Sequence, residues 1–198
     1  MNLKKLSVLA LLLLVFVSVS AIHAEAQKVE TGFLNRALVV NGEEYRCQVY
    51  VPREFHCSIK WPIILALHGG GEYGNDGIRQ TAGALASVIR RFPERVPAIV
   101  VFPQAHADGK PGWHDAEGRA ALAAVDEAIS EFSGDPSRVY LTGSSAGGNG
   151  RWYLASRYPD RFAAVVVVCG LISEFRGRTS GVLYPALAPA SELDPFAA

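Results

Sequence analysis

The chain has 198 residues, of which 49% are hydrophobic, 10% aromatic and 19% charged, an ordinary globular composition that predicts one domain with a sizeable core. Lysine plus arginine and aspartate plus glutamate both number 19, and the basic residues form no run, which argues against a nucleic-acid-binding surface. The sequence has no CxxC pair and no paired histidine spacing, so we expect no metal site, and no pattern in it predicts a cofactor.

The first 26 residues have the pattern of a secretory signal. Two lysines precede an apolar run from Leu6 to Ile22, and Ala24 and Ala26 then supply the small residues that a signal peptidase reads. A membrane anchor is the alternative, because about 17 apolar residues is the lower limit for spanning a bilayer, but three serines dilute the run. We predict cleavage after Ala26, a domain over residues 27–198, and a secreted or periplasmic protein without stable membrane insertion.

The three cysteines are Cys47, Cys57 and Cys169. Export would place them in an oxidising compartment where thiols pair, and an odd number leaves at least one over. Cys47 and Cys57 are nearest in sequence, yet Cys47 lies in the middle of an expected strand. The sequence therefore leaves the pairing open.

Strands and helices alternate after the signal. Residues 33–40 and 44–51 are β-rich and are separated by Asn-Gly at positions 41 and 42, which predicts an antiparallel hairpin. The later strands are solidly apolar, as expected where both faces of a parallel sheet are covered; they are Pro62–Leu67, Ala98–Phe102, Arg138–Gly143 and Ala164–Gly170.

Three helices are expected between these strands. Apolar residues recur at spacings of three and four over residues 78–92 and 122–132, and a third helix surrounds residues 152–158. Gly-Asp-Pro at residues 134–136 is expected to end the second helix. The alternation predicts an α/β fold, a doubly wound and mostly parallel sheet that opens with an antiparallel hairpin. Chemistry in such sheets lies at the carboxyl ends of the strands.

Two glycine-rich segments follow apolar strands, HGGGEYG at His68–Gly74 and GSSAGG at Gly143–Gly148. The second fits G-x-S-x-G, in which a strand turns sharply into a helix and presents a serine at the apex, while the glycines remove Cβ atoms that would clash. A flexible glycine loop is the alternative interpretation, and Ser144, in the variable position, is the competing serine. We predict that Ser145 is a nucleophile.

An attacking serine needs a base, and the oxyanion that it creates needs hydrogen-bond donors already in place. We expect one donor to be the backbone N–H of Ala146, where the following helix begins and its dipole favours negative charge. The other is expected from Gly70 or Gly71. His68 opens the same loop and is a tempting base, but we expect it to brace the loop through hydrogen bonds.

The arrangement resembles the α/β-hydrolase fold. Residues 135–170, together with residues 60–77 and Phe-Pro-Gln at 102–104, are similar to secreted esterases of the polyhydroxybutyrate-depolymerase, feruloyl-esterase and phospholipase/carboxylesterase group, and the similarity covers residues 30 to about 172. The resemblance implies Ser145 as nucleophile, Ala146 and Gly70 as oxyanion donors, and a triad in the order serine, acid, histidine. Its motifs do not fix the substrate.

The chain departs from that order. All of its histidines precede Ser145, namely His23, His56, His68, His106 and His114, and the acids after Ser145 are only Asp160, Glu174, Glu192 and Asp194. None of these acids follows an apolar strand, as the acid of the family should. The triad acid and histidine are therefore not present in this chain, and we expect an incomplete domain that lacks the last strands and helices.

A loop after the expected strand Ala98–Phe102 offers the nearest substitutes. His114 and Asp115 lie on the catalytic edge, but adjacent residues point in different directions, so we do not expect a relay from Ser145 through them. Trp113 is expected to form a wall of the substrate pocket, with simple packing as the alternative.

The sequence thus predicts a serine hydrolase that acts through an acyl-enzyme on a small or polymeric ester. A prolyl-oligopeptidase-like serine peptidase would share the sharp turn at Gly143–Gly147, called here the elbow. It would also share the glycine-rich segment at His68–Gly74 that is expected to supply an oxyanion donor. A non-catalytic secreted binding protein that retains the scaffold is the alternative from a different class.

Overall fold

The computed structural model describes residues 29–106 and 112–168. The expected signal segment, Cys169 and Gly170 of the last predicted strand, and the acids of the C-terminal stretch lie outside the described residues. From Thr31 onward the chain belongs to one unit, and that unit is described here.

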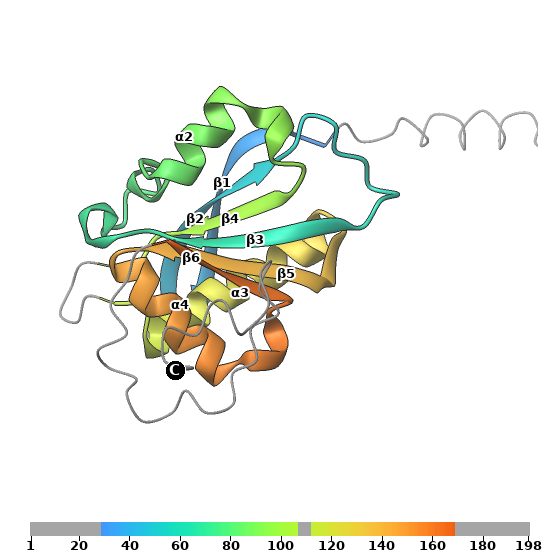
Figure 1. Cartoon of the computed structure of the whole chain (residues 1–198). Helices are drawn as coiled ribbons and strands as arrows, with labels where there is room; N and C mark the ends of the chain where they lie inside the picture. The colour runs from blue at the N-terminus through green and yellow to red at the C-terminus, as the bar shows by residue number, and fades with distance from the viewer. Residues whose placement is uncertain (1–28, 107–111, 169–198) are drawn as a thin grey trace, which may run out of the picture. The chain divides into compact units, whose positions relative to one another are not determined.

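Six strands form a single sheet in the order β1-β2-β4-β3-β5-β6 (Figure 1). The two pairs that involve β2 are antiparallel, and the three other pairs are parallel. This confirms the predicted mostly parallel sheet with an N-terminal hairpin. The strands are β1 Gly32–Val40, β2 Glu43–Val51, β3 Trp61–Leu67, β4 Ile99–Pro103, β5 Gly134–Ser144 and β6 Ala164–Val168.

The hairpin turn forms where the Asn-Gly pair predicted it. Asn41 has φ 54° and Gly42 has φ 86°, so both central residues occupy the left-handed region that the favoured two-residue hairpin turns require. Val40 pairs directly with Glu43 across the turn. The turn therefore fixes the register of β1 on β2.

Helices cover both faces of the sheet (Figure 1). Ile63, Leu65 and Leu67 of β3 join the large core cluster on the face covered by α3 and α4, whereas Ala66 joins a smaller cluster beneath α2. Burial on both faces is why β3 is solidly apolar, as predicted. The helices are α2 Ala84–Arg91, α3 Asp115–Glu131 and α4 Ala146–Arg157, with short 3-10 turns η1 Gly70–Glu72, η2 Arg79–Thr81, η3 Pro93–Arg95 and η4 Pro159–Arg161.

Two predicted boundaries are wrong. The helical pattern was expected to include Ile78, but Ile78 is 65% exposed and α2 begins only after Gly83, because the Asp76 carboxylate caps the N–H groups of Ile78 and Arg79 and starts a separate turn. The strand expected from Arg138 begins earlier, at Gly134, which pairs with Trp61. A Cβ at Gly134 would lie 2.8 Å from Ile63 Cδ1. This glycine therefore follows a helix, as predicted, and also allows β5 to pack closely against Ile63.

The two described cysteines are free thiols. Cys47 lies in β2 and is 2% exposed, whereas Cys57 is exposed, so the pairing between neighbours in sequence is not formed. Burial raises the pKa of the Cys47 thiol to about 12, and a buried protonated thiol is chemically inert. Cys47 is therefore a core residue.

Within residues 29–106 and 112–168, no helix has both the length and the apolar character needed to cross a membrane. The same residues contain no cluster of three or more histidine, cysteine, aspartate or glutamate side chains that could hold a metal ion.

Candidate active site

Ser145 stands at the turn between the end of β5 and the start of α4. It is exposed, and its backbone has φ 52° and ψ −115°. A non-glycine residue in such a conformation costs about 1–3 kcal/mol and persists only where the surrounding structure enforces it, most often at functional sites. The strained turn that G-x-S-x-G predicts is present here, with the serine rather than a glycine at its apex.

The glycines on either side of Ser145 are required by close contact. A Cβ on Gly147 would collide with the carbonyl oxygen of Leu67 and lie 2.6 Å from that of His68, and a Cβ on Gly143 would collide with the carbonyl oxygen of Gly147. The elbow therefore packs backbone to backbone against the end of β3. This contact holds the turn in its strained conformation.

The first glycine-rich segment, His68–Gly74, lies beside the elbow, and residues 68–78 are called here the glycine loop. A Cβ on Gly69 would lie only 3.5 Å from the Cβ of Ser145. Gly70 and Gly71 open the turn η1, and Ala146 opens α4, so their N–H groups have no acceptor within their own helices. The structure thus brings the predicted oxyanion donors to the edge of the sheet that carries Ser145.

His68 braces the glycine loop, as predicted. Its Nε2 accepts a 3.0 Å hydrogen bond from the N–H of Ala105, so Nδ1 carries the proton and donates to the carbonyl of Gly69 at 2.7 Å. Burial lowers the pKa of His68, which favours the neutral ring. Because both ring nitrogens are engaged, His68 is not placed to take a proton from Ser145.

Trp113 is placed differently from the pocket wall that we expected. Its side chain is 1% exposed, and its indole N–H donates to the carbonyl of His68 at 3.0 Å. The ring meets the His68 ring edge to face at a centroid distance of 4.7 Å, and a Cβ on Gly150 would collide with it. Trp113 therefore packs beneath the glycine loop, which is the alternative that the sequence left open.

Gln104 ties the glycine loop to the end of β4, and sequence reasoning missed its role. The side chain is 1% exposed; its Oε1 accepts from the N–H of Gly77 at 2.7 Å, and its Nε2 donates to the Asp76 carboxylate at 2.9 Å and to the carbonyl of Glu72 at 3.2 Å. A polar residue directly after an apolar strand, at the catalytic edge, was the signal that could have found it.

We expect Gln104→Met to lower the free energy of unfolding by about 2–3 kcal/mol, because it leaves the buried N–H of Gly77 and the half-buried carbonyl of Glu72 without their partner. Gln80 provides the matched control, since it is 2% exposed but its side-chain amide makes no hydrogen bond within the described residues. Gln80→Met should therefore be neutral or slightly stabilising. Urea denaturation of both variants checks this, and equal losses would contradict the role of Gln104.

Asp76 makes the stability of the loop depend on pH. Hydrogen bonds from the backbone of Arg79 and Ile78 and from Gln104 lower its pKa from 3.8 to about 2. A folded-state pKa below the unfolded value contributes stability that is complete above about pH 4 and lost as the pH falls toward 2. We expect Asp76→Asn to melt below the wild type at pH 6, with the difference shrinking below pH 3.5. A difference in melting temperature that is constant from pH 2 to pH 6 would contradict this.

Arg151 supports the elbow from inside the domain. It is 0% exposed and its Nη1 donates to the carbonyl of Gly143 at 3.2 Å, while its guanidinium lies 5.3 Å from the centre of the Trp152 ring. Arginine keeps its charge when buried. Position 151 thus places a permanent cation under the turn that carries Ser145.

The structure does not bring a described histidine into hydrogen bonding with Ser145. His114 packs edge to face on Tyr153, and the carboxylate of Asp115 accepts from the Tyr153 hydroxyl at 3.0 Å. His106 faces Glu43 at 3.1 Å, and His56 contacts Ser58 at 2.7 Å. In residues 29–106 and 112–168, no hydrogen bond joins Ser145 to any of these side chains.

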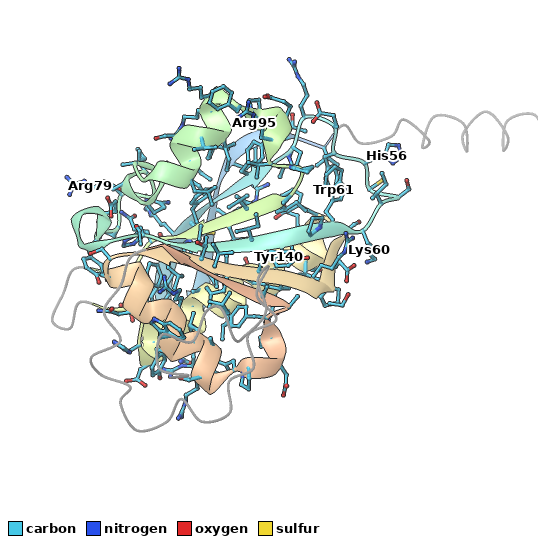
Figure 2. The ribbon with its side chains drawn as sticks, viewed as in Figure 1. His56, Lys60, Trp61, Arg79, Arg95 and Tyr140 are labelled. Atoms are coloured by element: carbon cyan, nitrogen blue, oxygen red, sulfur yellow. The ribbon has the colours of Figure 1, made fainter. Side chains whose placement is uncertain are left out.

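A cavity of about 740 Å³ lies between α2 and the sheet. Its walls are mostly apolar and come from β3, β5, β6 and α2, and at one end it reaches Gly69 and Ser144 beside the elbow. Figure 2 labels Tyr140, a wall residue on β5, Arg79 near the catalytic edge, and Lys60 and Trp61 at the opposite end of β3. One end of this apolar hollow is therefore lined by Ser144, the residue next to the candidate nucleophile.

Comparison with protein families gives a match to the prolyl oligopeptidase family over residues 104–177. The matched segment contains the elbow and covers less than half of the chain. The similarity to this family therefore concerns the part of the chain that carries Ser145.

Curated relatives are similar over a larger part of the chain. Acetylxylan esterase A of Aspergillus ficuum is 29% identical over 140 residues, which cover 62% of this chain and 41% of that protein. Pyrethroid hydrolase Ces2e of Rattus norvegicus is 25% identical over 155 residues, which cover 74% of this chain and 27% of that protein. The chain thus spans less than half the length of these relatives.

A solved structure described as that of a thermostable esterase superposes with a TM-score of 0.58. It is 26% identical, and the match covers 70% of this chain and 40% of that one.

Proposed function

The chain is an α/β-hydrolase related to esterases, and on that premise we propose that the protein hydrolyses carboxylic esters with Ser145 as its nucleophile. The observation that carries the proposal is the strained, exposed Ser145 at the head of α4, with φ 52°. Positive φ alone does not single out Ser145, since Ser133 has φ 51°; Ser145 combines it with ψ −115° and a place between β5 and α4, where a nucleophile at a sharp turn is presented to a substrate.

In the proposed reaction, Ser145 Oγ attacks the carbonyl carbon of the ester as its proton passes to a base. The N–H groups of Ala146 and of Gly70 or Gly71 stabilise the oxyanion, and collapse of the tetrahedral intermediate expels the alcohol and leaves an acyl-enzyme. Water then releases the acid by the same steps. The glycine loop is held in place by Gln104, His68 and Trp113, which do not contact the substrate in this mechanism.

The base is the component that the described residues do not bring to Ser145. We assign the base to a histidine outside the described residues. An acid would orient this histidine, in the order serine, acid, histidine that the resemblance implies. Because the chain spans less than half the length of these relatives, the proposed activity is that of the intact gene product. Its substrate class is small or polymeric esters, and the signal-like first 26 residues favour secretion.

A second candidate is a serine peptidase, and the match to the prolyl oligopeptidase family favours it. Side-by-side turnover of p-nitrophenyl acetate and a peptidyl-proline p-nitroanilide by the intact gene product separates the two. Ester hydrolysis at a kcat/KM at least about a hundredfold greater than that for the anilide supports the esterase. Faster cleavage of the anilide would replace the proposal by the peptidase, and turnover of neither would contradict both.

A further inference from the structure

Glu72 places a carboxylate next to the candidate nucleophile, and the proposed mechanism does not use it. A Cβ on Gly69 would lie 3.2 Å from Oε2 of Glu72 and 3.5 Å from the Cβ of Ser145. The carboxylate and the serine are thus no farther apart than the sum of these two short distances. Glu72 is also the one carboxylate among the residues that line the apolar cavity at the elbow.

The Glu72 side chain is held at this position but is not neutralised there. Its backbone is fixed, because its carbonyl accepts from Gln104 and its N–H donates to Gly69. The side chain is half-buried, and among the described residues no lysine, arginine or histidine forms an ion pair with it. Keeping a partly buried carboxylate ionised in an apolar wall costs free energy unless a cation binds beside it. A substrate bound in the cavity could supply that cation.

We infer that Glu72 selects substrates that carry a positive charge close to the scissile carbonyl, such as an ammonium group on the acyl or the alcohol side. This inference rests on the proposed function, because it concerns which esters reach Ser145. A cation bound between the glycine loop and the elbow would meet the negative charge of Glu72 in a setting poorer in water than the open surface. An anionic substrate would be repelled by the same carboxylate.

The other ionisable groups of the glycine loop do not cancel this charge, although the buried guanidinium of Arg151 lies beneath the elbow, at the carbonyl of Gly143. His68 is the neighbour on the glycine loop, and burial lowers its pKa, so the ring is neutral near pH 7. Asp76 of the loop forms an ion pair with Arg79 of η2 at 3.1 Å. The net charge that this part of the glycine loop presents beside Ser145 is therefore negative.

Matched esters that differ only in charge test the inference. Acetylcholine and 3,3-dimethylbutyl acetate have the same shape, and a second pair carries the trimethylammonium or tert-butyl group on the acyl side of a p-nitrophenyl ester. For the intact gene product, kcat/KM should favour the cationic member of at least one pair by about tenfold, the size of one partly screened ion pair. Raising the salt concentration to about 0.5 M should weaken the preference.

Glu72→Gln should bring that ratio close to one, because kcat/KM for the cationic ester falls more than kcat/KM for the neutral ester. Glu94→Gln is the control for net charge, since Glu94 is exposed in η3, outside the residues that line the cavity, and it should keep the preference. If Glu72→Gln does not fold, the salt dependence of the ratio in the unmodified protein decides. Equal kcat/KM within both pairs, or a preference that Glu72→Gln leaves intact, would overturn the inference alone, whereas failure to hydrolyse any of the four esters would overturn the proposed function as well.

Discussion

Ser145→Ala should reduce ester hydrolysis by the intact gene product by about 10⁴-fold or more, while the protein stays folded. Removal of a serine nucleophile costs enzymes of this kind a factor of this order, because no group remains to form the acyl-enzyme. Folding should survive because the Ser145 side chain is exposed and accepts no described hydrogen bond. Rates with p-nitrophenyl acetate and a thermal melt measure the two effects.

The neighbouring serine provides the control for that substitution. Ser144 precedes the apex, as the last residue of β5, so Ser144→Ala should change the rate by no more than about threefold on the scale of peripheral contacts. Loss of activity in Ser144→Ala with retention in Ser145→Ala would exchange the roles of the two serines. Equal, small effects in both variants would remove serine catalysis from this site.

Gly147→Ala should be strongly destabilising. The new Cβ would collide with the carbonyl oxygen of Leu67, and neither backbone can withdraw without separating α4 from β3. We expect a loss of more than about 3 kcal/mol in the free energy of unfolding, at the upper end of overpacking effects. Denaturant titration, or loss of soluble protein where the variant does not fold, reports it.

The matched control is Gly83→Ala at the N-cap of α2. A Cβ there would meet nothing within 4 Å, and Gly83 has φ −71°, which any residue adopts. Its effect on the free energy of unfolding should stay within about 0.5–1 kcal/mol. Similar losses in the two variants would show that close packing of the elbow on β3 does not hold the turn.

Local patterns were sufficient to predict the elements that build the site. The Asn-Gly turn, the solid apolar strands and the spacing of Gly143, Ser145 and Gly147 each act through a few adjacent residues, so the sequence alone predicted the hairpin, the sheet and the elbow. The predicted brace at His68 was confirmed; one of its hydrogen bonds goes to the next residue and the other comes from the distant Ala105.

Features that depend on the packing of distant segments could not be predicted in this way. Trp113 packs beneath a loop that begins at His68, and Gln104 bonds to Gly77; each contact joins segments that no periodicity connects. Ile78 fits the apolar spacing of α2 but is exposed, because the carboxylate of Asp76 starts a separate turn at that point. Local capping there outweighs a weak helical pattern.

The position of Glu72 is of the same kind. In the sequence it is one acidic residue in a glycine-rich segment, which is typical of a solvated loop. Its proximity to Ser145 arises only when the glycine loop is tied down by Gln104 and His68. The proposed specificity at this site is therefore a property of the folded loop, while the motif alone predicts the candidate nucleophile.

Labelling of the intact gene product with a fluorophosphonate probe, followed by peptide mapping, tests most directly whether Ser145 is an activated nucleophile. We predict a single adduct on the peptide that contains Ser145, its absence after heat denaturation, and its absence in Ser145→Ala. A folded protein that remains unlabelled, or an adduct located on another residue, would contradict the assignment of Ser145.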